Sequence, residues 1–163
     1  MDAYALQLLN YVIRPTLHHL GIADAETKAW LLLGTATVAT ASSAVRPYAK
    51  HFGIYTITHA DHVRIWDEFL ANDADLASTV RGLASQHRFL QQPDEELNTN
   101  LAYATAIAAM FYEESISTWP HTAEPACLGS LWARGFWPHM DRDAAEFSRL
   151  LTPLQQPSVR AAA

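Results

Sequence analysis

Three neighbouring residues, His59, Asp61 and His62, carry side chains that could do chemistry. Two imidazoles three positions apart share one face of a helix and are potential zinc ligands. Because the sequence offers no organised third ligand beside them, we interpret both histidines as surface or interface residues. Asp61 follows Thr58 by three positions, which is the spacing of a capped helix start, and we assign it to that structural role.

Other types of catalytic centre find little support in the sequence. Cys127 is the single cysteine, so it forms no internal disulfide and lacks Cys or His neighbours at metal-binding spacing. Ser42 and Ser43 are not flanked by the glycines of a nucleophile elbow. A phosphate-cradling glycine loop and a dinucleotide fingerprint are also missing. We therefore expect neither a metal nor a cofactor.

The length and composition favour one globular domain. The chain has 163 residues, of which 50% are hydrophobic, enough to fill a single core. Its net charge is -6, and no basic run is present, which argues against nucleic acid or an anionic membrane surface as a partner. A protein or a carbohydrate is the more suitable binding partner for a chain of this charge. We expect one domain over residues 1–152 and a loosely ordered tail over 153–163.

Apolar periodicity predicts an all-α fold. The uncharged run at residues 29–45 contains Gly, Thr and Ser and is short for a bilayer crossing, so it reads as a buried helix and not a membrane span. The N-terminus has no basic region ahead of an apolar run, and we expect no secretory signal. Residues 42–58 lack periodicity and read as an ordered loop with a brief extended stretch. The predicted helices span residues 3–20, 25–42, 59–71, 76–90, 93–114, 125–136 and 143–151.

Two expectations concern how these helices pack. The helix at 59–71 should bury Val63, Trp66, Phe69 and Leu70. The helix ending near residue 114 carries an alanine series that permits close backbone approach, so we place it beside the helix at 25–42.

Five segments together carry a resemblance to a known family. In order they are the Leu-Leu-Leu-Gly-Thr-Ala run at 31–36, Gly-Ile-Tyr-Thr-Ile at 53–57, the helix at 59–70, Val-Arg-Gly-Leu-Ala at 80–84 and Asn-Leu-Ala-Tyr-Ala-Thr-Ala-Ile at 100–107. This series resembles tailed-phage virion proteins with a lysozyme-like or lytic-transglycosylase-like domain. The resemblance implies a helical fold close to goose-type lysozyme and the soluble lytic transglycosylases, with a cleft for peptidoglycan glycan.

The resemblance also implies positions for the catalytic acid and the cleft. In that family the buried helix ends in Glu-Ser, and the glutamic acid protonates the glycosidic oxygen. Here those positions hold Ala39 and Thr40, the cleft glutamine is replaced by Thr56, and Phe136-Trp137 stands where a Tyr-Asn pair is expected. The residues that the resemblance assigns to the cleft lining are Thr40, Gly53, Ile54, Tyr55, Thr56, Tyr103, Phe136 and Trp137.

The departure at position 39 bears directly on activity. Glycoside cleavage at neutral pH requires a proton donor with a raised pKa at the leaving oxygen, and alanine cannot donate a proton. Residues 29–45 contain no Asp or Glu, so a shift of one helical turn does not restore the acid. Asp61 is the fallback acid, while Glu113 and Glu114 are expected to be solvated. We expect a pseudoenzyme.

Three hypotheses follow from these residues. The first is a structural virion protein of the tail, baseplate or ejection apparatus, made in the host cytoplasm, whose partners are other virion proteins. In it, Trp119, Trp132 and Trp137 are candidate protein contacts. The second is an active peptidoglycan-cleaving enzyme that uses Asp61, or in which Ala39 replaces a natural glutamate. The third is a module that binds glycan without cleaving it.

Overall fold

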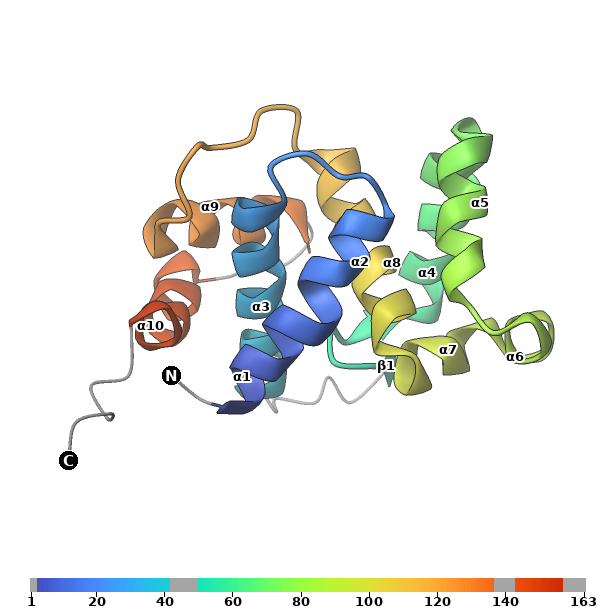
Figure 1. The fold of residues 1–163 in the computed structure, drawn as a ribbon, viewed down its shortest axis with the longest axis horizontal. Coiled ribbons are helices and arrows are strands. Elements are labelled where there is room, and N and C mark those ends of the chain that lie inside the picture. Colours follow the sequence, from blue (N-terminus) through green and yellow to red (C-terminus); the bar gives the residue numbers. More distant parts are fainter. Residues whose placement is uncertain (1–2, 42–49, 137–142, 157–163) are drawn as a thin grey trace.

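The structure is a computed structural model that describes residues 3–41, 50–136 and 143–156 (Figure 1). Most of these residues are helical, one pair of two-residue strands is the other regular structure in the described ranges, and turns and loops make up the rest. The prediction of an all-α chain is therefore confirmed. No helix in the described ranges is both long and apolar enough to cross a membrane.

The N-terminal rod consists of α1 (Ala3–Leu8), a π-helical turn η1 (Leu9–Ile13) and α2 (Arg14–His19). Pro15 has no backbone N–H with which to continue the α-helical ladder, and the wider π turn immediately precedes it. The buried face of the rod carries Leu9, Ile13 and Leu17. Gly21, at a φ of +65°, ends the rod, in agreement with the predicted helix end at residue 20.

Two central helices, α3 (Ala25–Ala41) and α8 (Leu101–Ser115), lie against each other as the alanine series predicted. Both are buried around most of their circumference. The Thr35 and Tyr112 hydroxyl oxygens are 2.6 Å apart in this buried contact. Thr35 also donates to the carbonyl of Leu31 within α3, and Tyr112 is therefore the donor to Thr35.

A short hairpin follows the segment after α3. Its strands are β1 (His51–Phe52) and β2 (Ile57–Thr58), which pair antiparallel with Phe52 opposite Ile57. The turn between them closes with a hydrogen bond from Thr56 N to Gly53 O at 3.1 Å. Gly53 has a φ of +66°, and a Cβ there would lie 2.1 Å from the carbonyl oxygen of Leu97, so only glycine fits.

The next elements run α4 (His59–Arg64), the π turn η2 (Ile65–Phe69), the 3₁₀ turn η3 (Leu70–Asn72), α5 (Ala74–Leu83), α6 (Gln86–Gln91) and α7 (Pro93–Thr99). The predicted helices at 76–90 and 93–114 are thus each two helices. The Ser85 side chain accepts from Arg88 N and starts α6, and the Asn100 side chain accepts from Tyr103 N and starts α8. Apolar periodicity alone predicted one continuous helix in each range, but the caps at Ser85 and Asn100 begin a new helix within it.

The last two helices are α9 (Pro125–Gly135) and α10 (Ala144–Gln155), which pack on each other and on α3, at the other end of the molecule from α5 and α6 (Figure 1). α10 continues past the predicted end at residue 151. Leu154 is buried, and Gln155 Nε2 donates to the carbonyl of Ala123 at 2.7 Å. The start of the predicted tail is therefore helical and held by a side-chain hydrogen bond.

Candidate functional site

Position 39 lies in the last turn of α3, and the turn carries no carboxylate. Ala39 is half-buried, and Thr40 is exposed and donates its hydroxyl to the carbonyl of Ala36. The acidic residue of α3 is Glu26 in the first turn, 13 positions away, or about 20 Å along the axis. It is bound to Arg14 and to the indole of Trp30. Glu26 therefore cannot stand in for an acid at position 39.

The aromatic residues assigned to the cleft by the resemblance lie in the interior. Tyr55, Tyr103 and Phe136 are each at most 2% exposed. Tyr55 shares a hydrogen bond with the hydroxyl of Thr105 at 3.1 Å, and burial raises the pKa of its phenol. The ring of Phe136 packs on Tyr112, with centroids 5.4 Å apart. These three side chains are therefore part of the core and are not exposed to line a surface cleft.

The remaining cleft candidates are distributed differently. Gly53, Ile54 and Thr56 are half-buried in the hairpin turn. The backbone N–H of Gly53 donates to the Asn98 side chain at 2.8 Å, so it is already occupied. Trp137 lies outside the described residues.

A buried polar cluster surrounds His62. Its Nδ1 is 2.8 Å from Asp94 Oδ1 and its Nε2 is 2.7 Å from the hydroxyl of Tyr103. Trp66 Nε1 donates to the same hydroxyl at 2.9 Å. His59 Nδ1, on the exposed side, is 2.7 Å from the other oxygen of Asp94. One carboxylate at the start of α7 thus orients two imidazoles from α4.

The electrostatics of this cluster follow from burial and from Asp94. Burial lowers the pKa of His62, and the hydrogen bond and charge of Asp94 oppose this without reversing it. Burial acts to raise the pKa of Asp94, but hydrogen bonds and charge from His62 and His59 together hold it below its usual value. The pKa of Tyr103 is raised, chiefly by burial. A neutral His62 that donates to Asp94 and accepts from Tyr103 satisfies every group.

The surface interpretation of the two histidines is right for His59 and wrong for His62. The His59 side chain is 68% exposed, whereas that of His62 is 3% exposed. The interior accepts His62 because both of its ring nitrogens have partners. No group of three or more metal-ligating side chains that could hold an ion occurs within the described ranges. No sequence signal near residue 62 points to the distant partners Asp94 and Tyr103.

Asp61, the fallback acid, takes part in capping α4. The Thr58 hydroxyl accepts from the backbone N–H of Asp61 at 3.2 Å and donates to its carboxylate. The predicted helix start is therefore confirmed. The Asp61 carboxylate accepts a hydrogen bond from the Thr58 hydroxyl at the start of α4, so its side chain serves the helix cap and is not free to approach a glycosidic oxygen.

Two of the candidate contact tryptophans can be placed. Trp132 is 2% exposed and stacks on Phe147, so it belongs to the core between α9 and α10. Trp119 is half-buried, and Lys28 Nζ lies 4.4 Å from the centroid of its ring. Of the pair, only Trp119 presents part of its ring to solvent.

The same lysine corrects the expectation that Glu113 is solvated. Lys28 Nζ lies 2.7 Å from Glu113 Oε1, and the two side chains are 7% and 26% exposed. Glu114 likewise pairs with Arg64 at 2.7 Å. Both carboxylates at the end of α8 therefore pair with cations of neighbouring elements, but Glu113 is half-buried, whereas Glu114 is exposed as expected.

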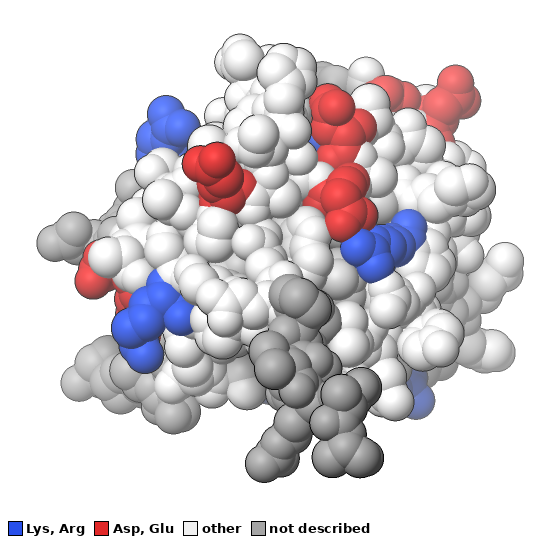
Figure 2. Space-filling view, turned by 60° about the vertical axis from the view of Figure 1, so that its left-hand side comes forward, with Lys and Arg blue, Asp and Glu red and all other residues white. Residues whose placement is uncertain are grey.

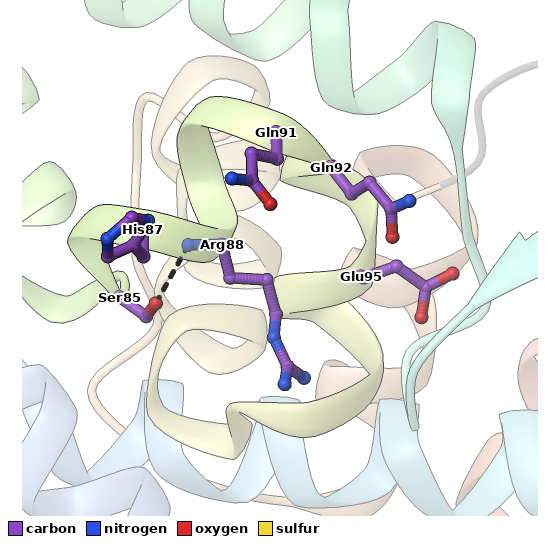
Figure 3. Close-up of a pocket in the computed structure, with 6 residues that line it drawn as sticks. All are labelled: Ser85, His87, Arg88, Gln91, Gln92 and Glu95. Atoms are coloured by element: carbon purple, nitrogen blue, oxygen red, sulfur yellow. Dashed lines mark hydrogen bonds between the residues drawn. The ribbon is translucent and has the colours of Figure 1, made fainter.

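The surface also carries a hollow over α6 and the start of α7, which the sequence reasoning did not identify. Its volume is about 590 Å³, within the range of about 300–1,000 Å³ that is typical of ligand sites. Polar side chains line it (Figure 3): Ser85, His87, Arg88, Gln91, Gln92 and Glu95.

Charged groups are scattered over the face drawn in Figure 2, which is the side of the molecule at the left of Figure 1. Lys and Arg side chains stand singly there among acidic and uncharged residues. Binding of a nucleic acid backbone requires clustered cations, so this face does not suit it.

Comparison with known proteins adds no assignment: no family model, curated protein or solved structure matches this chain.

Proposed function

We propose that this chain is a non-catalytic structural protein of a tailed-phage particle, positioned in the tail, baseplate or ejection apparatus. In this proposal a lysozyme-like helical domain has lost peptidoglycan hydrolysis and contributes binding surfaces to its neighbours. The observation that carries the proposal is the alanine at position 39, where the family resemblance places the general acid.

The burial of the predicted cleft residues supports the same conclusion. A simple loss of the acid would leave an open cleft lined by aromatic residues. Instead, Tyr55, Tyr103 and Phe136 are packed inside, with hydrogen bonds or ring contacts to the chain itself. Asp61 is committed to the cap of α4. The two carboxylates considered as substitutes, Glu26 in the first turn of α3 and Asp61 in the cap of α4, therefore both have other partners.

The first experiment is product analysis by mass spectrometry after incubation of purified peptidoglycan with the unmodified chain and with Ala39→Glu. We expect no soluble muropeptides from either protein, because one carboxylate does not reopen a filled cleft. A purified active lysozyme provides the positive control, and circular dichroism verifies that the variant is folded.

Each other result would contradict the proposal in a distinguishable way. Muropeptides from the unmodified chain would establish an active enzyme, and Asp61→Asn would then test the fallback acid. Cleavage by Ala39→Glu alone would mean an intact cleft, with Ala39 a replacement of a natural glutamate or a recent loss. Sedimentation with intact cell wall without cleavage would favour a glycan-binding module.

Mass spectrometry of purified phage particles tests the structural role itself. A component of the tail, baseplate or ejection apparatus is expected in a fixed copy number that matches the symmetry of its location. Absence of the chain from infectious particles would overturn the virion assignment, whatever the outcome with peptidoglycan.

A further inference from the structure

The hollow over α6 and α7 contains two opposite charges that do not pair with each other. Arg88 lies on α6 and Glu95 on α7. Among the six lining residues the hydrogen bond drawn in Figure 3 is the helix cap from Arg88 N to Ser85 Oγ, and no ion pair connects Arg88 with Glu95. Opposite charges that share a hollow without pairing present complementary ends to a ligand.

Separate hydrogen bonds hold the two charges apart. Arg88 Nη1 donates to the hydroxyl of Thr99 at 3.1 Å, near the end of α7. The Glu95 carboxylate accepts from Asn98 Nδ2 at 3.1 Å on the same helix. Lys50 reaches the other oxygen of Glu95 only at 3.6 Å, and its side chain is 72% exposed, so that contact is weak and replaceable.

A buried carboxylate beneath the hollow fixes its shape. Glu96 is 1% exposed, and its Oε2 accepts from the backbone N–H of Ser85 and from Asn100 Nδ2, each at 3.1 Å. Asn100 Nδ2 also donates to the carbonyl of Leu83. This network ties the start of α6 to the junction of α7 and α8. A hollow that exists before binding lowers the entropic cost of taking up a ligand.

The lining restricts the chemical class of the ligand. A phosphate or dicarboxylate would face the Glu95 carboxylate, and a polyamine would face the Arg88 guanidinium. A lipid or aromatic ligand would find no aliphatic or aromatic hydrocarbon residue among the six lining residues, which are all of polar or charged type. The amides of Gln91 and Gln92 make no side-chain hydrogen bond within the described part of the chain, and each can both donate and accept.

We propose that this hollow binds a short peptide with free termini: its carboxylate on Arg88, its ammonium on Glu95, and its peptide bond on the Gln91 and Gln92 amides. A guanidinium recognises a carboxylate through two parallel hydrogen bonds, which gives the ligand one orientation. The inference does not depend on the virion proposal, since the hollow would bind the same ligand whatever larger assembly the chain joins.

Glycine oligomers with free termini test the proposal, because they lack side chains and lengthen the charge separation by about 3.3–3.6 Å per residue. Glycine, diglycine and triglycine are titrated into the full chain and followed by calorimetry and by NMR shifts. We expect diglycine or triglycine to bind at least tenfold more tightly than glycine. N-acetyl-diglycine and diglycinamide, which each lack one terminal charge, are expected to bind at least tenfold more weakly than diglycine.

Charge-specific variants assign each end of the ligand. In Arg88→Gln, diglycine and diglycinamide should bind equally, because the carboxylate has lost its partner. In Glu95→Gln, diglycine and N-acetyl-diglycine should bind equally, while the hydrogen bond from Asn98 is preserved. Arg134→Gln and Glu124→Gln remove exposed charges outside the hollow and should leave the affinities unchanged. Thermal melts verify that all four variants are folded.

Three outcomes would overturn the proposal. One is no saturable binding of any glycine oligomer at millimolar concentration. The second is equal binding of free and blocked oligomers to the unmodified chain, which would exclude recognition of the termini. The third is tighter binding of a neutral disaccharide that both variants leave intact, which would assign the hollow to polyhydroxyl ligands instead. The peptidoglycan digestion has a different readout, so failure of either proposal is seen separately.

Discussion

Among the described residues, Thr56 is the one whose side chain is least compatible with its backbone conformation. It has a φ of +52°, in the left-handed region that β-branched residues strongly disfavour. Asp24, at a φ of +53°, is the other non-glycine residue at positive φ in the described ranges, and a short polar side chain tolerates that conformation better. The closed turn from Gly53 to Thr56 imposes the strain at Thr56.

Replacing Thr56 by glycine should therefore stabilise the protein. The left-handed conformation costs a residue with a Cβ about 1–2 kcal/mol, and glycine removes that strain. Part of this gain is offset because glycine has a higher conformational entropy in the unfolded chain. We expect the free energy of unfolding, measured with urea, to rise by about 0.5–1 kcal/mol.

Thr79→Gly, at a half-buried position in the right-handed helix α5, is the matched control and should lower stability by at least a few tenths of a kcal/mol. A loss of stability in Thr56→Gly would mean that the contacts of the Thr56 side chain outweigh its backbone strain.

At the scale of single residues, interactions between near neighbours in the sequence could be predicted, but hydrogen-bond partners far apart in the sequence could not. Thr58 and Asp61 are three positions apart, so the cap was readable from the sequence. His62 was assigned to the surface and Val63 to the core, whereas His62 is buried and Val63 is 41% exposed. By hydropathy, valine is the more suitable of the two residues for the core. The imidazole of His62 can nevertheless be buried because it hydrogen-bonds to Asp94 and Tyr103, which are 32 and 41 positions away.

At the scale of elements, most helices could be predicted because their apolar periodicity persists over several turns. The α3 and α9 boundaries lie within about one residue of expectation, as is usual for strongly patterned segments. The breaks at Ser85 and Asn100 were missed, since an apolar pattern continues across them and only the cap chemistry marks the new helix. The hollow over α6 and α7 was missed for another reason: the sequence predicted a helix boundary between residues 90 and 93, but it did not indicate how the side chains of the two helices are arranged around that boundary.

Two glycines in helices should respond oppositely to alanine. A Cβ on Gly34 in α3 would lie 2.2 Å from Cζ of Phe147, a fully buried residue of α10. Gly34→Ala must therefore push α10 away and should lower the free energy of unfolding by about 1–3 kcal/mol.

A Cβ on Gly82 in α5 meets nothing within 4 Å, so Gly82→Ala should raise stability by about 0.5–1 kcal/mol. Urea unfolding of Gly34→Ala and Gly82→Ala measures the two changes in the free energy of unfolding. Equal effects in the two variants would show that α3 and α10 can separate at no cost.

At the scale of the whole molecule, the burial of His62 makes stability depend on pH. The pKa of His62 in the folded protein lies below its ordinary value of about 6.5, so the unfolded chain binds the proton more readily. The contribution of neutral His62 to the free energy of unfolding is therefore complete above about pH 6.5 and decreases as the pH falls below that value. The groups facing His62 are Asp94 from α7, Tyr103 from α8 and His59 from α4.

Urea unfolding between pH 7.5 and 5.5 measures this dependence. We expect a declining free energy of unfolding for the unmodified protein and a smaller decline for His62→Gln, whose amide does not titrate. Asp94, with its lowered pKa, adds a further loss in the same direction only near and below pH 4. An identical pH dependence in His62→Gln would exclude His62 as the cause.

The meeting of α3 and α8 has a consequence for how quickly the chain folds. Thr35 and Tyr112, which join the two central helices, are 77 positions apart in the sequence. Closing a loop of that length carries an entropic term of (3/2)RT ln n, or about 4 kcal/mol, before the core contacts can offset it. Helices α9 and α10 are neighbours along the chain and can associate without that delay. The rate-limiting barrier to folding should therefore be the encounter of α3 with α8.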